Sequence, residues 1–262
     1  MFICVNLWFQ IMFSIDLNCD MGESFGAWQM GRDAELMDYV SSINIACGFH
    51  AGDASVIRKT IETAIKKEVA IGAHPSFPDL QGFGRRAMSL SAQEIFDVVL
   101  YQVSALKGIC KAFGATLHHV KPHGALYNQA AKEAGLAEAI AKAVKAIDEN
   151  LILYGLSNSF LISEAEKINL KTASEVFADR TYQADGTLTP RTEPNALIYD
   201  TEKAVSQVLE IIREQSVPAA TGEKVSLKSE TVCIHGDGEN ALEFAAAIRQ
   251  KLTEEGISIN FM

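Results

Sequence analysis

The sequence predicts a parallel β/α barrel, and three observations support this fold class. Short apolar runs typical of buried strands alternate with helical runs from residue 14 to residue 254. Seven such units fit within the 262-residue chain. Ionisable side chains recur where the apolar runs end, as expected where parallel strands share an active-site edge. We therefore expect a barrel of seven strands, with an open doubly wound sheet as the alternative.

The predicted elements follow one another in a regular order. Strands are expected at 14–20, 42–48, 69–74, 117–122, 151–156, 172–178 and 231–235, and helices at 54–67, 91–113, 129–148, 160–168, 201–215 and 239–254. In the first helical run, Ile57, Ile61 and Ile65 recur four residues apart and mark one buried face. Ser91 and Glu94 have the spacing of a capping box, which predicts the start of the second helix.

The division of the chain is predicted from its linkers and its first residues. No proline- or glycine-rich linker interrupts residues 14–262, so we expect one catalytic barrel domain there. Residues 1–13, MFICVNLWFQIMF, are apolar, but a membrane-spanning helix needs about 20 residues. They also lack the basic region of a signal peptide. We interpret them as an extension from an upstream start, with Met12 as the natural start and a membrane-surface anchor as the alternative.

Charge and cysteine content exclude several classes of partner. The net charge is −10 and no Lys/Arg-rich run occurs, which argues against nucleic acid as a partner. No segment predicts a membrane-spanning helix. The cysteines are odd in number, lack a CxxC pair and are expected to be reduced, as in a cytoplasmic protein; they are Cys4, Cys19, Cys47, Cys110 and Cys233.

Ionisable and amide side chains gather at the carboxyl ends of the predicted strands. In chain order they are Asn18, Asp20, His50, His74, Lys121, His123, Glu175, Asp179, Arg180, His235 and Asp237. Because the carboxyl ends of parallel strands meet at one end of a barrel, we expect these side chains to form one site. Buried ionisable groups are costly without partners, so their repetition favours function over chance.

Two groups in this set keep alternatives open. His50, His74 and Asp20 carry imidazole and carboxylate ligands suited to a divalent metal, although no HExxH or HxxxH pair occurs. Lys121 either holds an anion or acts as a base, or it forms a structural ion pair with Asp20 or Glu175.

The loop GFGRR, residues 82–86, adds a basic group after the third strand. Arg85 and Arg86 present planar forks that suit carboxylate or phosphate, and the alternative is a turn with a solvated basic edge. The chain contains no Walker A motif, no convincing dinucleotide fingerprint and no GxSxG nucleophile elbow.

The strand-end motifs together resemble the LamB/YcsF family. The motifs are DLNCDMGE (16–23), NIACGFHAGD (44–53), GAHPSFPDLQGFGRR (72–86), HVKPHGALYN (119–128), SEVFADRTYQADGTLTPR (174–191) and CIHGDG (233–238). They occur in order from about Ser14 to the C-terminus. Met21 stands where the family usually has leucine, and Gly238 where it usually has proline or asparagine. The segment before Met12 has no counterpart in the pattern.

The resemblance implies a fold and an activity. Family members look like seven-stranded β/α barrels related to the glycoside hydrolase/deacetylase group. They act as the A component of 5-oxoprolinase, which opens the lactam 5-oxoproline to L-glutamate with ATP hydrolysis. Two partner subunits, B and C, take part. The implied cofactor is ATP with its Mg²⁺, the implied location is the cytoplasm, and a second copy of the chain is left open as a further partner.

The implied chemistry assigns roles to the candidate residues as hypotheses. Asp20 or His123 acts as general base, and Lys121 stabilises an oxyanion or phosphoryl oxygen. His50 and His74 position water or hold a metal. Contacts to carboxylate and phosphate are assigned to Arg85, Arg86 and Arg191, orientation of basic groups to Glu175 and Asp179, hydrogen bonds to Asn18 and Asn44, and further substrate contacts to Arg180, His235 and Asp237. Lys121→Met is expected to lower turnover with little loss of stability.

Two rival functions are kept. A metal-dependent amide or polysaccharide deacetylase would use the same barrel and histidines without ATP. A non-catalytic protein that only binds substrate or partners would have little need of buried charge at the strand ends.

Overall fold

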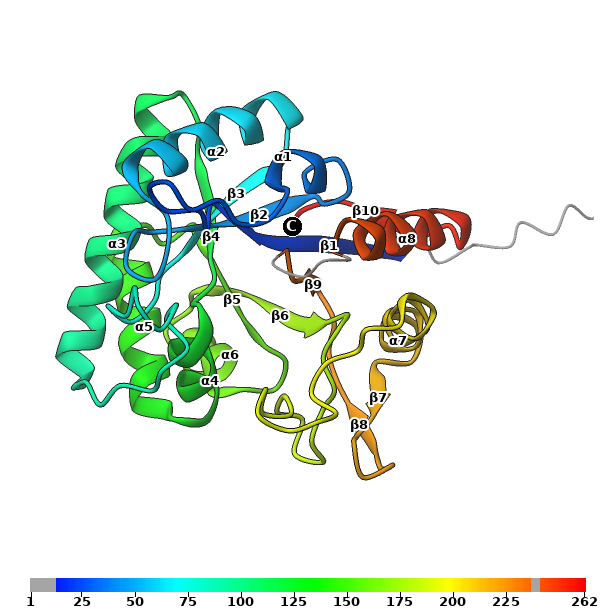
Figure 1. The fold of residues 1–262 in the computed structure, drawn as a ribbon. Helices are drawn as coiled ribbons and strands as arrows, with labels where there is room; N and C mark the ends of the chain where they lie inside the picture. The colour runs from blue at the N-terminus through cyan, green and yellow to red at the C-terminus, as the bar shows by residue number, and fades with distance from the viewer. Residues whose placement is uncertain (1–12, 237–240) are drawn as a thin grey trace, which may run out of the picture.

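The strands form a closed parallel barrel in the computed structural model, which describes residues 13–236 and 241–262 (Figure 1). They are β1 (Ser14–Met21), β2 (Ser42–Ala46), β3 (Ala70–His74), β4 (Leu117–Val120), β5 (Ile152–Leu156), β6 (Lys171–Phe177) and β9 (Thr231–Ile234). Each pairs with the next, and β9 pairs back with β1, all in parallel. The predicted seven-stranded barrel is confirmed.

The long helices surround the barrel on its outside (Figure 1). They are α2 (Ala54–Lys67), α3 (Ala92–Ala112), α4 (Gly124–Lys132), α5 (Ala134–Ile147), α6 (Phe160–Lys167), α7 (Thr201–Glu214) and α8 (Ala241–Glu254). The single helix predicted at 129–148 was wrong: Glu133 is extended and separates α4 from α5. Residues 239 and 240, the predicted start of the last helix, lie outside the described residues.

The shortest elements were not predicted. They are α1 (Asp33–Leu36), β10 (Ser258–Ile259) beside β1, and an antiparallel hairpin of β7 (Ser216–Pro218) and β8 (Lys224–Ser226). None is long enough to carry a hydrophobic period, which needs a window of several turns or residues.

Local capping explains where two helices begin. The predicted capping box of α3 is confirmed, with Ser91 and Glu94 bonding reciprocally. At α2, the exposed carboxylate of Asp53 accepts from the backbone N–H groups of Ser55 and Val56 at 2.8 and 2.9 Å. Asp53 therefore serves as an N-cap at this rim.

A polar layer fills the barrel beneath its carboxyl end. His119 Nε2 donates to Asn44 Oδ1 at 2.8 Å, and Asn44 Nδ2 donates to Asn18 Oδ1 at 2.8 Å. The His119 ring also stacks on Tyr154, with ring centroids 4.0 Å apart. Gly72 on β3 makes room for this ring, because a Cβ at that position would overlap it. The polar layer thus depends on one residue without a side chain.

Gly72→Ala is expected to lower the free energy of unfolding by about 1–3 kcal/mol, because the added methyl group overpacks a ring that Tyr154 already holds in place. Urea denaturation of the full chain measures the change. Gly108→Ala is the matched control: a Cβ at Gly108 on α3 meets no atom within 4 Å, so the helix should be unchanged or stabilised by up to about 1 kcal/mol. Equal stability of Gly72→Ala and the unaltered chain would refute this account.

Two further predictions concern the membrane and the thiols. Among the described residues, no helix has both the length and the apolar content needed to cross a bilayer. The four described cysteines, which exclude Cys4, are all free, as expected for reduced thiols. The interpretation of residues 1–13 falls, apart from Phe13, outside the described residues.

Candidate active site

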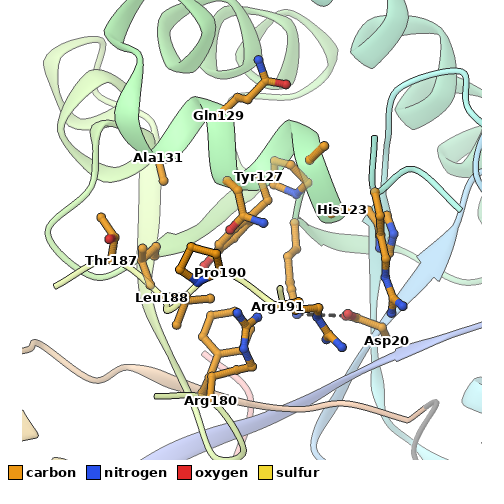
Figure 2. Close-up of a pocket in the computed structure, with 18 of the residues that line it drawn as sticks. Asp20, His123, Tyr127, Gln129, Ala131, Arg180, Thr187, Leu188, Pro190 and Arg191 are labelled. Carbon is orange, nitrogen blue, oxygen red and sulfur yellow. Dashed lines mark hydrogen bonds and ion pairs between the residues drawn. The ribbon is translucent and has the colours of Figure 1, made fainter. Parts of the chain in front are cut away.

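A cavity of about 570 Å³ lies at the carboxyl ends of the barrel strands (Figure 2). Its volume is in the range typical of small-molecule sites. Its walls have three kinds of lining: polar groups from the strand ends, Asp20, His74, Lys121 and His123; apolar groups, Leu156, Phe177, Leu188 and Pro190; and cations, Arg85, Lys132, Arg180 and Arg191. The cavity therefore combines a charged floor with an apolar wall and a cationic rim.

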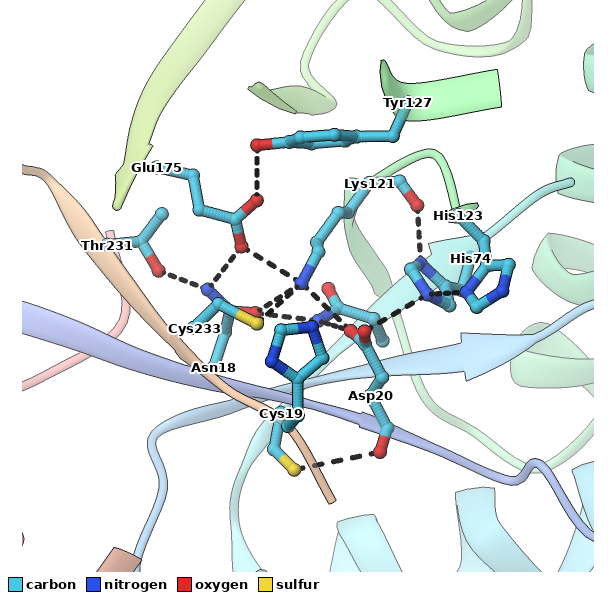
Figure 3. Close-up of polar contacts among 12 residues, drawn as sticks. Asn18, Cys19, Asp20, His74, Lys121, His123, Tyr127, Glu175, Thr231 and Cys233 are labelled. Atoms are coloured by element: carbon cyan, nitrogen blue, oxygen red, sulfur yellow. Dashed lines mark hydrogen bonds and ion pairs between the residues drawn. The ribbon is translucent and has the colours of Figure 1, made fainter. Parts of the chain in front are cut away.

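Lys121 is the centre of a buried network (Figure 3). Its Nζ lies 2.9 Å from both Asp20 Oδ1 and Glu175 Oε1, and 3.0 Å from both Asn18 Oδ1 and Cys233 Sγ. The side chain is only 2% exposed. Burial alone would lower the pKa of Lys121, but the carboxylates of Asp20 and Glu175 raise it well above its ordinary value. The structural ion pair, one of the two alternatives, is present, and Lys121 also lines the cavity.

Asp20 stands between Lys121 and His74. Its Oδ1 accepts from Asn44 Nδ2 at 2.9 Å, and its Oδ2 lies 3.3 Å from His74 Nε2. Burial by itself would raise the pKa of Asp20, but His74 and Lys121 bring it well below the ordinary value. Asp20 is therefore ionised at neutral pH, with one oxygen held and the other facing an imidazole.

Glu175 anchors the far side of the network. It accepts from Asn18 Nδ2 at 3.0 Å through Oε1, and from the Tyr127 hydroxyl at 2.7 Å through Oε2. Burial, reinforced by the charge of Glu175, raises the pKa of Tyr127 well above its usual range, so the phenol remains a donor. The sequence analysis missed Tyr127. The available signal was its place one helical turn after His123.

Three histidines and a carboxylate meet beside this network. His50 stacks on His123 with ring centroids 3.8 Å apart, and His123 Nδ1 lies 2.9 Å from His74 Nε2. Glu23 Oε1 lies 3.4 Å from His50 Nε2 and 3.7 Å from His123 Nδ1. Glu23 was also missed by the sequence analysis, although it ends the motif DLNCDMGE two residues beyond β1.

The cationic rim includes two arginines from the loop after β6. Arg180 donates to the backbone oxygens of Thr189 and Ala196, at 2.6 and 3.3 Å, so its guanidinium is fixed in place. Burial and the neighbouring Arg191 lower the pKa of Arg180 to about 10, which leaves it charged at neutral pH. Figure 2 shows Arg180 and Arg191 at the same side of the cavity.

His235 also lines the cavity and is oriented by Asp179. The Nδ1 of His235 lies 2.8 Å from both carboxylate oxygens of Asp179. Burial would raise the pKa of Asp179, but His235 holds it below its ordinary value. An ionised Asp179 therefore favours a proton on the Nδ1 of His235.

Not every predicted residue reaches the cavity surface. Asn18, Asn44, Glu175 and His50 lie behind the residues that line it, as a supporting layer. Arg86 is not among the lining residues and forms an ion pair with Asp79 within its own loop. Asp237 lies outside the described residues.

Two clusters of described residues have the geometry to hold a metal ion. One consists of Glu23, His50, His74 and His123, and the other of Asp20, Cys233 and His235. The set anticipated from the sequence, His50, His74 and Asp20, is thus divided between the two clusters.

Comparison with known proteins adds sequence and structural relatives. Residues 15–262 match the LamB/YcsF family. The A component of 5-oxoprolinase from Tolumonas auensis is 61% identical, over 96% of this chain and 100% of the relative. The A component of 5-oxoprolinase from Bacillus subtilis is 57% identical, over 95% of this chain and 96% of the relative.

A solved structure has the same fold. The lactam utilization protein from Thermus thermophilus superimposes with a TM-score of 0.90 at 44% identity, over 95% of this chain and 100% of that chain. The chain described here belongs to the LamB/YcsF family.

Proposed function

We propose that this LamB/YcsF family member is the A component of an ATP-dependent 5-oxoprolinase, which with subunits B and C converts 5-oxo-L-proline to L-glutamate. The names of relatives that match nearly the full length support the proposal. The structural observation that carries it is the buried Asp20–Lys121–Glu175 network at a small cavity. Buried charge of this kind is what a hydrolase of an unreactive amide requires.

The cavity suits a small cyclic amide that bears a carboxylate. Phe177, Leu188 and Pro190 offer an apolar surface to the ring. Arg180 and Arg191 offer guanidinium groups to the substrate carboxylate. This pose directs the lactam carbonyl toward Asp20 and Lys121. Arg86 has no place in it, because its fork is engaged by Asp79.

The chemistry is a phosphorylation followed by hydrolysis. The lactam oxygen takes the γ-phosphoryl group of ATP, and ADP leaves. Water then adds to the activated carbon, and the ring C–N bond breaks to leave an acyl phosphate. A second water hydrolyses the acyl phosphate, which frees the carboxylate and releases phosphate. The ring nitrogen takes up a proton and becomes the amino group of glutamate. Because the phosphorylated carbon is strongly electrophilic, a weak base is sufficient to accept the proton of the attacking water.

Asp20 is the better placed of the two proposed bases. Its Oδ2 lies 3.3 Å from His74 Nε2, a long contact that an incoming water can share. His123 has one ring nitrogen at His74 and the other at the backbone oxygen of Phe83. Lys121 has three protons and four neighbours, of which the Cys233 thiol is the weakest acceptor. A developing oxyanion replaces that thiol.

ATP, its Mg²⁺ and the two partners complete the proposal. Within the cationic rim, Arg85, Lys132 and Arg191 suit phosphate groups delivered from a neighbouring subunit. The four cysteines within the described residues are free, which fits a cytoplasmic location, where thiols stay reduced.

The test measures glutamate release from 5-oxoproline. The full chain is assayed alone and with its two partner subunits, each with and without ATP, at matched protein concentration. We expect glutamate only in the complete mixture with ATP. Release that does not depend on ATP, or no release in any mixture, would refute the proposal.

A second candidate is a metal-dependent amide or polysaccharide deacetylase, which the cluster of Glu23, His50, His74 and His123 favours. This activity predicts acetate release from acetylated amides or sugars by the chain alone, without ATP. Glutamate release confined to the complete, ATP-containing mixture would exclude it as the main activity.

A further inference from the structure

The cluster of Glu23, His50, His74 and His123 has features that its hydrogen bonds do not explain. Its members lie at or just beyond the carboxyl ends of four adjacent strands, β1 to β4, and the three imidazoles are at most 5% exposed. One potential ligand atom from each residue lies within 4.8 Å of all the others. Four groups that can each donate an electron pair therefore converge on one point beside the cavity.

The protons of two imidazoles can be assigned from their partners. His74 Nδ1 lies 2.7 Å from the backbone oxygen of Lys121, and His123 Nε2 lies 2.9 Å from the backbone oxygen of Phe83. A carbonyl only accepts, so both nitrogens carry hydrogen, and in neutral rings the remaining nitrogens carry lone pairs. Those two nitrogens, His74 Nε2 and His123 Nδ1, face each other at 2.9 Å. A positive centre, either a proton or a metal ion, must separate them.

His50 distinguishes between a proton and a metal ion. Among the described residues, neither of its ring nitrogens has a hydrogen-bond partner, although the residue is 1% exposed. Leaving a buried polar group unpaired costs about 1–3 kcal/mol. A proton shared by His74 and His123 leaves His50 as it is. A metal ion engages His50 and the carboxylate of Glu23 as well.

The surroundings fix the ligands in the required form. Backbone oxygens that accept from the second ring nitrogen, as at His74 and His123, are the usual support of metal-bound histidines. Gly84 packs against the cluster, where a Cβ would lie 2.9 Å from both His50 Cβ and His123 Cδ2.

Neighbouring charges bear on cation binding. Arg85 lines the same cavity, and its positive charge opposes the binding of a metal cation at the cluster. The carboxylates of Glu23 and Asp20 offset the charge of Arg85. The other cluster, Asp20, Cys233 and His235, is different, because the Lys121 ammonium already lies 2.9 Å from Asp20 and 3.0 Å from Cys233. A cation already occupies that position.

We propose that Glu23, His50, His74 and His123 bind one divalent transition-metal cation. Three imidazoles and one carboxylate suit Zn²⁺, Mn²⁺ or Fe²⁺, whereas Mg²⁺ prefers oxygen ligands and is not expected here. Ligands about 2.0–2.1 Å from a tetrahedral ion lie roughly 3.4 Å apart, so His74 and His123 separate slightly while the other ligands close in. The proposal rests on the geometry of the cluster and not on the oxoprolinase activity.

The test is metal binding by the full, tag-free chain after treatment with a chelator. Calorimetric titration with Zn²⁺, and with Mg²⁺ in parallel, gives stoichiometry and affinity. We expect one equivalent of Zn²⁺, no comparable Mg²⁺ binding, and at least tenfold weaker Zn²⁺ binding in His50→Gln. Titration with Co²⁺ should give the visible absorption bands of a nitrogen-ligated site in the unaltered chain and not in His50→Gln.

The controls separate the site from non-specific histidine binding and from misfolding. His118→Gln removes a histidine outside the cluster and should bind Zn²⁺ like the unaltered chain. Circular dichroism checks that His50→Gln folds. If it does not, Glu23→Gln takes its place as the cluster variant, and it is also expected to bind Zn²⁺ at least tenfold more weakly. No Zn²⁺ bound by the unaltered chain, or equal binding by the folded cluster variants, would overturn the proposal in favour of a shared proton. Neither outcome depends on glutamate release.

Discussion

Lys121→Met is expected to lower ATP-dependent glutamate release by about 10²–10³-fold and the free energy of unfolding by about 3–5 kcal/mol. The ammonium group forms ion pairs with both Glu175 and Asp20, and Asp20 has His74 as a further neighbour. Its removal leaves two buried carboxylates with much less compensation. The sequence-based expectation of little stability loss therefore changes once the 2% exposure of the side chain is known. Glutamate assays and urea denaturation measure the two effects.

A double variant separates the two effects of Lys121. Glu175→Gln in the Lys121→Met background removes one uncompensated charge while keeping the shape of the side chain, so much of the lost stability should return. Activity should stay low, because the positive group beside the cavity is still missing. Lys107→Met is the surface control, since Lys107 pairs with Asp148 on the outside of the barrel and is 37% exposed. Near-normal turnover in the double variant would show that Lys121 has only a structural role.

Much of the fold was predictable because alternating apolar and amphipathic runs report burial directly. The observed end of a strand differs from the predicted end where the chain turns to place a residue of the candidate site. The fourth strand was expected to reach residue 122, but β4 ends at Val120, because Lys121 turns into the barrel and His123 precedes α4. The split between α4 and α5 left no such signal, since the alanine-rich run on both sides of Glu133 keeps the same helical composition.

The site was predictable only as far as the strand ends determine it. Because the strands are parallel, Asp20, His74 and Lys121 lie at the same carboxyl end of the barrel, whatever the orientation of each side chain. Contacts made by loops depend on backbone conformation instead. Arg85 lines the cavity and Arg86 does not. One reason is that the Arg86 guanidinium is held by the Asp79 carboxylate. The other is that Gly84, whose φ is +64°, turns the loop just before the two arginines. Neither feature has a signature in the spacing of the two arginines.

Asp20→Asn is expected to lower ATP-dependent glutamate release by about 10²–10⁴-fold, because the amide cannot accept the proton of the attacking water. The cost in stability should be smaller, about 1–3 kcal/mol, since an amide oxygen can still accept from Lys121 and Glu175 keeps that ammonium paired. Glutamate release by the complex of chain, partners and ATP measures the first effect. Urea denaturation of the chain alone measures the second.

The pH dependence of stability and a matched control distinguish Asp20 from an ordinary surface carboxylate. The folded pKa of Asp20 is depressed, so its stabilising contribution is present above its ordinary pKa of about 4 and is lost as the pH falls below it. The stability difference between Asp20→Asn and the unaltered chain should therefore shrink in acid. Asp53→Asn makes the same chemical change at the N-cap of α2, where asparagine caps as well as aspartate. It gives up only the hydrogen bond that Asp53 Oδ2 accepts from Gly26 N at 2.7 Å. It should leave turnover unchanged, and Asp20→Asn with turnover equal to that of Asp53→Asn would remove Asp20 from the mechanism and leave His123 as the base.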